Sequence, residues 1–174
     1  MNLGCPAPRV FKKNVGGGLL RSPHEIREIL SMLRSEVDSL LTVKMRIGFE
    51  DDRYFHELLE AINNFEIDLL SLHARTVLGG YRSLPSYDHV AEAVKCASCP
   101  VLLNGNVTSS SSANYLKELT GAHGVMIGRS AIRNPWIFRQ IREDQLKVPV
   151  FKPTMADVYE YIIDLYQSLE KPGM

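Results

Sequence analysis

The residues with the clearest chemical potential follow five short apolar runs, each at the point where the run ends. Cys5 follows the first run and lies between Gly4 and Pro6, where a permissive residue and a residue of fixed φ define a turn. A thiol on such a turn is placed to react, whereas a lone cysteine is most often a small buried core residue. The later runs end in Lys44 and Arg46, in His73 and Arg75, in Asn104-Gly105-Asn106, and in Gly128-Arg129. Five consecutive ends with a polar or reactive group are more than chance placement would give.

Taken singly, each of these groups also has an ordinary structural interpretation. Lys44 and Arg46 are equally compatible with the solvated end of an edge strand, and His73 is compatible with a core histidine. Asn104-Gly105 is compatible with a plain turn, and Gly128-Arg129 with a helix start. A helix start is also a natural phosphate site, because its free N–H groups and dipole favour an anion. The functional interpretation therefore depends on the whole set.

The loop after Cys5 is basic and rich in glycine. It carries Arg9, Lys12 and Lys13, followed by glycines at 16–18. We expect these glycines to let the backbone approach a ligand, and the cations to suit phosphate. Residues 1–49 hold eight Lys or Arg against four Asp or Glu, and the remainder holds twelve against sixteen. An anionic partner should therefore meet the N-terminal part.

Short β-rich runs and amphipathic helical segments must position these groups. After the first step, strands are expected within 41–47, 69–73, 101–104 and 124–128. The first helix is expected to start at Ser22-Pro23, with Ser22 and Glu25 forming a capping box. Asn134-Pro135 is expected to cap a later helix. Strands that are apolar throughout and separated by such helices are typical of parallel β/α architecture, in which ligands gather at the C-terminal strand ends.

Composition excludes several classes of protein. A chain of 174 residues that is 45% hydrophobic predicts one soluble globular unit without a membrane span or a signal peptide. Three cysteines indicate a reducing, cytoplasmic compartment rather than a disulfide framework. The Cys96-Ala97-Ser98-Cys99 pair offers two ligands where structural zinc needs four, so no metal is expected and the pair is interpreted as packing.

Beyond Lys147 the pattern changes. Residues 148–153 form an extended connection, and Thr154 is expected to cap a helix with Asp157 three residues on. The apolar face of this helix, which includes Ile162 and Leu165, needs a partner that we expect beyond the end of the chain.

Six ordered stretches together resemble the dihydrouridine synthase family, flavoenzymes that reduce uridine in transfer RNA. The stretches are Asn2-Leu3-Gly4-Cys5-Pro6, Gly16-Gly17-Gly18-Leu19-Leu20, Val43-Lys44-Met45-Arg46, Leu72-His73-Ala74-Arg75-Thr76, Asn104-Gly105-Asn106-Val107 and Gly124-Val125-Met126-Ile127-Gly128-Arg129 with Asn134-Pro135 following. They lie within residues 2–142. Ala74 departs from the glycine usual in the family, and Asn106 from the usual aspartate.

The resemblance implies FMN-dependent reduction of uridine to 5,6-dihydrouridine in tRNA, with NADPH as the reductant. Cys5 would be the general acid that protonates the pyrimidine, a role worth on the order of 10²–10⁴-fold in rate. The implied cofactor-binding residues are Lys44, His73, Asn104, Gly105, Asn106, Gly128 and Arg129, with Gly128 and Arg129 at the phosphate. The candidates for RNA phosphate contacts are Arg9, Lys12, Lys13 and Arg75.

The resemblance also implies the fold, which is α/β. Residues 1–147 would form a partial FMN-binding TIM (β/α)8 barrel of about five later β/α units. Residues 148–174 would form a linker and the first helix of a truncated C-terminal helical tRNA-binding domain. The chain is therefore expected to be a fragment, and self-association through the open barrel is expected to be favourable.

Two other functions remain open. One is another FMN-barrel pyrimidine oxidoreductase, similar to dihydroorotate or dihydropyrimidine dehydrogenase. The other is a catalytically inactive remnant with residual RNA binding.

Overall fold

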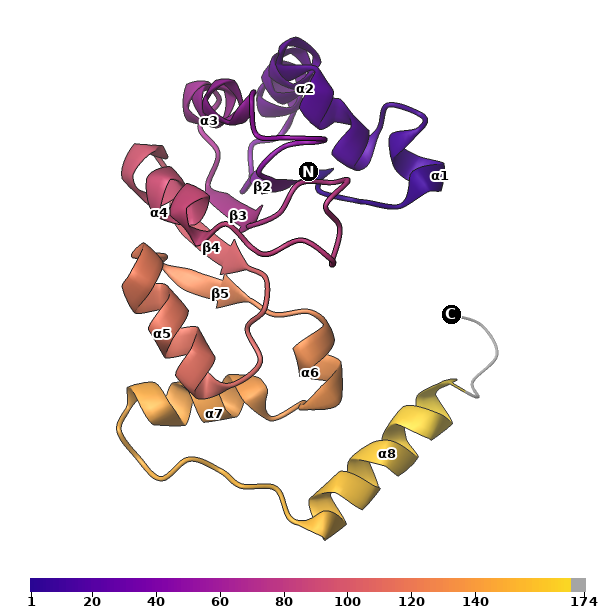
Figure 1. The fold of residues 1–174 in the computed structure, drawn as a ribbon, viewed down its shortest axis with the longest axis vertical. Coiled ribbons are helices and arrows are strands. Elements are labelled where there is room, and N and C mark those ends of the chain that lie inside the picture. Colours follow the sequence, from indigo (N-terminus) through magenta and orange to yellow (C-terminus); the bar gives the residue numbers. More distant parts are fainter. Residues whose placement is uncertain (170–174) are drawn as a thin grey trace.

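The computed structural model describes residues 1–169, so the last five residues of the expected C-terminal segment lie outside the described part. Five parallel strands form one sheet in which neighbours in space are also neighbours in sequence (Figure 1). The strands are β1 (Asn2–Leu3), β2 (Thr42–Arg46), β3 (Leu69–His73), β4 (Val101–Asn104) and β5 (Gly124–Met126). This order is consistent with part of a TIM-barrel-like domain and confirms the predicted α/β class.

Helices connect the strands. They are α1 (Pro8–Phe11), the 3-10 helix η1 (Gly16–Arg21), α2 (Pro23–Glu36), α3 (Phe55–Asn64), α4 (Tyr87–Cys96), α5 (Ser110–Thr120), α6 (Arg129–Arg133), α7 (Ile137–Gln145) and α8 (Met155–Leu169). Helices α3, α4 and α5 lie along one side of the sheet, and α7 packs against α5 (Figure 1). No helix within residues 1–169 is long and apolar enough to cross a membrane.

One face of the sheet is apolar and belongs to the core. Leu3, Met45, Leu72 and Leu103 lie on this face and are fully buried. The helices contribute residues of the same kind from their inner sides: Ile26, Leu30, Phe55, Leu58, Ile62, Val90, Ala93, Ala113 and Leu116. Burial of this apolar surface is the main source of the stability of the sheet.

The other face of the sheet is polar. Successive side chains of a strand point to opposite faces, so Lys44 and Arg46 share the face opposite Met45. Strand register then places Arg46 beside His73, and His73 beside Asn104. The expectation of strands that are apolar throughout is wrong for β2, which alternates because only one of its faces is packed under helices.

The helix ends differ in part from the expected caps. Ser22 precedes α2, but its side chain makes no capping hydrogen bond, so the expected capping box with Glu25 is wrong. Trp136, and not Asn134, is the N-cap residue of α7. Thr154 and Asp157 do form the expected reciprocal cap at the start of α8.

Helix α8 makes few contacts with the rest of the chain. The Tyr161 hydroxyl donates a hydrogen bond of 2.6 Å to the backbone oxygen of Ile132, and the Tyr161 ring lies 5.9 Å from that of Trp136. None of its side chains is buried, and Ile162 and Leu165 are exposed. Within the described residues, the apolar face that was expected to need a partner is open.

Candidate active site

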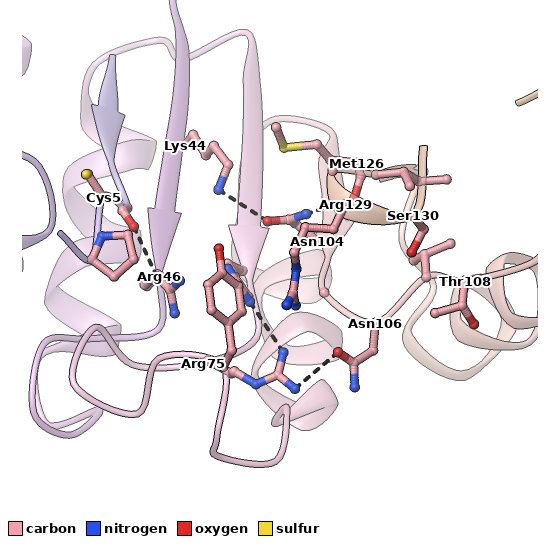
Figure 2. A pocket seen from close by; sticks show the side chains of 18 of the residues that line it. Cys5, Lys44, Arg46, Arg75, Asn104, Asn106, Thr108, Met126, Arg129 and Ser130 are labelled. Carbon is pink, nitrogen blue, oxygen red and sulfur yellow. Dashed lines mark hydrogen bonds between the residues drawn. The ribbon is translucent and has the colours of Figure 1, made fainter. Parts of the chain in front are cut away.

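A cavity of about 740 Å³ opens where the five strands end (Figure 2). The residues expected to act on substrate or cofactor line it: Cys5, Lys44, His73, Asn104, Gly105, Asn106, Gly128 and Arg129. Arg75 lines it as well, whereas Arg9, Lys12 and Lys13 do not. The carboxyl ends of neighbouring parallel strands meet at one edge, and this is why residues far apart in sequence converge here.

The turn that carries Cys5 is held from several sides. The Asn2 side-chain oxygen accepts a hydrogen bond of 3.0 Å from the Gly4 amide, and Arg46 Nε donates one of 3.0 Å to the Gly4 carbonyl. The Gly17 amide donates to the Cys5 carbonyl at 3.3 Å. The thiol itself is half-buried and free, so it is held in place and still reaches the cavity.

Arg46 is the most deeply buried charged group of the site, with 1% of its surface exposed. Besides the Gly4 carbonyl, its guanidinium donates to the Thr76 carbonyl at 2.9 Å and so ties the Cys5 turn to the loop after β3. Burial lowers its pKa from the usual value. The interpretation of Lys44 and Arg46 as a solvated edge is therefore wrong, because β2 lies between β1 and β3. Lys44 and Arg46 are two residues apart in β2 and so lie on the same face of the sheet, a pattern from which Arg46 could have been assigned to the site.

Lys44 and Asn104 meet across the intervening strand β3. Lys44 Nζ donates a hydrogen bond of 3.2 Å to Asn104 Oδ1, and Asn104 Nδ2 donates one of 2.8 Å to the Met126 carbonyl. Burial, and then the charge of Arg46, lower the pKa of Lys44. The amine is thus oriented by a neutral partner, which leaves its charge available to a ligand.

His73 is buried and neutral. Burial lowers its pKa to about 3, and nearby cations add to the effect. In order of effect these cations are Arg46, Lys44, Arg75 and Arg129. The imidazole is therefore uncharged at neutral pH and has no imidazolium proton to give there.

Arg75 belongs to the cavity rather than to the outer surface. It is 5% exposed, and it donates hydrogen bonds to the Ser83 carbonyl at 2.7 Å and to Asn106 Oδ1 at 3.2 Å. Its Nη1 lies 3.5 Å from Nε2 of His73. Sequence analysis grouped Arg75 with Arg9 and Lys12 as candidates for RNA contact. Arg9 and Lys12 are exposed, whereas Arg75 is buried, so its position suits a ligand in the cavity better than RNA at the surface.

The turn after β4 depends on Gly105. Its φ of +128° is strained for other residues, and a Cβ there would lie 3.3 Å from the His73 ring. Asn106 follows with a φ of +56°, a conformation that asparagine tolerates better than most residues. This backbone brings the Asn106 side chain to Arg75.

Tyr81 and Arg129 form a stacked pair over the cavity. The Arg129 guanidinium lies 3.9 Å from the centre of the Tyr81 ring, a distance typical of a cation–π contact. The same ring lies 6.3 Å from that of His73. Sequence reasoning missed Tyr81, because it lies in the loop after β3 and belongs to no strand end.

The charge of the cavity has a single sign. Its cationic side chains are Lys44, Arg46, Arg75, Arg129 and Arg133, and none of the residues that line it within the described chain is Asp or Glu. Cations without nearby counter-charges raise the local positive potential. The cavity is therefore suited to an anionic ligand.

The glycines at 16–18 have a packing role. A Cβ on Gly17 would lie 2.6 Å from the Cys5 carbonyl oxygen, and one on Gly18 would lie 2.6 Å from the Phe11 carbonyl oxygen. Gly17 and Gly18 are buried and do not line the cavity. The expectation that these glycines let the backbone approach a ligand is therefore wrong. They let η1 pack against the Cys5 turn.

Cys96 and Cys99 lie away from the cavity. Cys96 is exposed at the end of α4, and Cys99 is buried, which raises the pKa of its thiol. Within residues 1–169, no group of three or more His, Cys, Asp or Glu side chains could hold a metal ion.

Comparison with known proteins gives a consistent result. The family model described as dihydrouridine synthase matches residues 1–171. A probable tRNA-dihydrouridine synthase of Helicobacter pylori is 34% identical over 172 residues, which are 97% of this chain and 52% of that protein. The tRNA-dihydrouridine synthase B of Vibrio cholerae is 37% identical over 143 residues, which are 82% of this chain and 44% of that protein. The chain spans about half the length of the curated relatives it matches.

Proposed function

The chain belongs to the dihydrouridine synthase family, and on that premise we propose that it reduces uridine to 5,6-dihydrouridine in tRNA, with FMN as the cofactor and NADPH as the reductant. Residues 1–147 would then form part of an FMN-binding TIM barrel, and residues 148–174 would begin a helical tRNA-binding domain. Relatives that share most of this chain carry the name tRNA-dihydrouridine synthase, which supports the substrate.

One observation supports the cofactor above all others. Among the described residues that line the cavity are five cationic side chains, no acidic one, and the free thiol of Cys5. FMN carries a phosphate, and its reduced ring is negatively charged, so this potential suits both of its ends. The volume of about 740 Å³ falls in the range of small-molecule sites. At Gly128 a Cβ would meet no atom of residues 1–169 within 4 Å, so this glycine leaves an open cradle beside Arg129.

The proton of the reaction would come from Cys5. Bound FMN, once reduced by NADPH, would supply hydride to one carbon of the pyrimidine. The Cys5 S–H bond breaks as its proton moves to the neighbouring carbon, and a thiolate remains. Arg46 is close enough to Cys5 for their charges to interact, so it would stabilise that thiolate. Its hydrogen bond to Gly4 keeps the turn in place meanwhile.

The other polar side chains would bind and orient. Lys44 would place its positive charge against the reduced flavin ring, with Asn104 fixing the direction of the amine. His73 would remain a neutral hydrogen-bonding group, because its pKa of about 3 excludes a positive charge at neutral pH. The proposal therefore assigns the proton transfer to Cys5 and gives His73 a binding role.

The exposed cations after Cys5 would contact tRNA. Arg9, Lys12 and Lys13 lie on and just after α1, on the segment that leads out of the Cys5 turn. Cations at the rim of a site can bind phosphates of the RNA backbone without reading sequence. Arg75 is better assigned to the cavity, because it is buried and bonded to Asn106.

The visible spectrum of the purified 174-residue chain tests the proposal. After incubation with FMN and gel filtration, we expect a flavin spectrum that NADPH bleaches. With tRNA present, dihydrouridine should appear. Product from free uracil or dihydroorotate but not from tRNA would favour another pyrimidine oxidoreductase. A folded chain that takes up no FMN would contradict the proposed function of this polypeptide.

A further inference from the structure

Helix α6 contributes two arginines to the lining of the cavity. Arg129 and Arg133 are four residues apart, so they lie on one side of the helix, and both line the cavity. Ser130 of the same helix and Thr108 lie on the opposite side of the cavity from Cys5 (Figure 2). Sequence analysis assigned Arg129 to phosphate and left Arg133 without a role.

The two arginines are not equally available. The Arg129 guanidinium lies over the Tyr81 ring at 3.9 Å, which directs it toward the centre of the cavity. Arg133 is exposed, and its side chain makes no hydrogen bond, ion pair or ring contact with another residue of the described chain. A cation that lines a cavity and has no partner is free to bind an anion.

Two neighbouring side chains are suited to donate hydrogen bonds. Thr108 and Ser130 carry hydroxyls, while Asp and Glu are absent from the described residues that line the cavity. Gly128 leaves open space where a Cβ would stand. A phosphate monoester has only acceptor oxygens and up to two negative charges, so it matches two guanidinium groups and two hydroxyls. Because α6 has only five residues, these side chains, and not the helix dipole, supply the attraction.

From these observations we infer that Arg133 binds the phosphate of FMN together with Arg129, so that this chain holds that group in a two-arginine clamp. The inference rests on the proposed function and adds a binding residue to it. Arg133 supplies the unengaged cation, and Arg129 links the phosphate end to Tyr81 at the centre. Arg133 has no part in the proton transfer at Cys5.

Riboflavin isolates the phosphate, because it has the same ring and ribityl chain without that group. We would titrate FMN and riboflavin into the flavin-free chain and into Arg133→Ala, with fluorescence quenching as the readout. Loss of one charge-assisted contact at an exposed position should weaken FMN binding roughly tenfold and leave riboflavin binding unchanged. The FMN affinity of Arg133→Lys should lie between those of the unaltered chain and Arg133→Ala, because lysine keeps the positive charge but lacks the planar guanidinium group.

Arg142→Ala is the matched control. Arg142 is an exposed arginine on α7 that does not line the cavity, so its removal changes net charge equally and should leave both affinities unchanged. Equal weakening of FMN and riboflavin by Arg133→Ala would indicate a structural role and overturn the inference. An unchanged FMN affinity would also overturn it, and a loss confined to tRNA binding would assign Arg133 to RNA instead. If the unaltered chain binds neither flavin, the proposed function falls along with the inference.

Discussion

The two faces of the five-stranded sheet come from alternating residues of the same strands and have opposite properties. Met45, Leu72 and Leu103 point into the core and are fully buried under helices. One step along the chain, Lys44 and His73 point into the cavity and carry its chemistry. The comparison shows that residues adjacent in the sequence can have different roles. One stabilises the core and the next serves the site, because successive side chains of a strand point to opposite faces of the sheet.

The polar face opposes folding where the apolar face promotes it. Burial lowers the pKa of Lys44, Arg46 and His73, which means that their charged forms are disfavoured in the folded chain. The cations also repel one another, since no acidic residue lines the cavity within the described part. An anionic ligand should therefore stabilise the fold by offsetting this repulsion as well as by mass action.

The largest expected effect concerns the polar face alone. Cys5→Ala should lower dihydrouridine formation on the order of 10²–10⁴-fold, because the proton donor is removed while the flavin contacts remain. The measurement is dihydrouridine in tRNA per bound flavin. Cys96→Ala removes an exposed cysteine outside the cavity and should leave the rate unchanged. Full activity of the Cys5 variant would remove the acid role.

Two neighbouring residues of β3 test the separation of the faces directly. Leu72→Ala should lower the free energy of unfolding by about 2–5 kcal/mol, because a fully buried side chain leaves a cavity in the core. Ser71→Ala, on the other face, loses only a contact of 3.1 Å to the Met126 sulfur and should cost less than about 1 kcal/mol. Urea denaturation measures both. Equal costs would contradict the division between the faces.

The pH dependence of stability tests the charge on the polar face. Below the ordinary pKa of 6.5, an unfolded chain protonates His73, whereas the folded chain keeps it neutral down to about pH 3. The unfolded state thus binds the extra proton, and the free energy of unfolding falls as pH drops through this window. At pH 5 the expected loss is about 1–2 kcal/mol, allowing for screening by water. His73→Gln should remove this part of the pH dependence, and an unchanged profile would contradict a buried neutral histidine.

A pair of glycines gives the sharpest contrast between packing and ligand binding. Gly17→Ala should lower the free energy of unfolding by about 1–3 kcal/mol, because its Cβ would lie 2.8 Å from Val77 Cγ2 as well as against the Cys5 carbonyl. Gly128→Ala meets no atom within 4 Å and should leave stability nearly unchanged, while its methyl group weakens FMN binding. Thermal unfolding and flavin titration separate the two effects. A stability loss at Gly128 would contradict the open cradle.

Much of the fold and of the site could be predicted from local pattern. The apolar runs predicted the strand positions, and the polar groups at their ends predicted that Lys44, His73 and Asn104 lie at one edge of the sheet. Strand pairing places His73 beside Asn104, and a hydrogen bond joins Asn104 to Lys44. This succeeds because parallel strands joined by helices bring their carboxyl ends to one edge, whatever the details of the loops. The Thr154–Asp157 cap was predictable for a different reason, because it spans only three residues and is set by local sequence.

The remaining features depend on distances between segments that the sequence does not place. The Arg46 bridge from the Cys5 turn to Thr76 and the contact of Arg129 with the Tyr81 ring each join parts of the chain that are far apart in sequence. Gly17 lies in a glycine-rich sequence of the kind found in ligand-binding loops, but its neighbours are atoms of Cys5 and Val77. The sequence by itself determined which residues reach the edge of the sheet, because hydrophobic periodicity is local. Only the tertiary structure decided which of them bind one another and which remain free for a ligand, because that depends on close packing between distant segments.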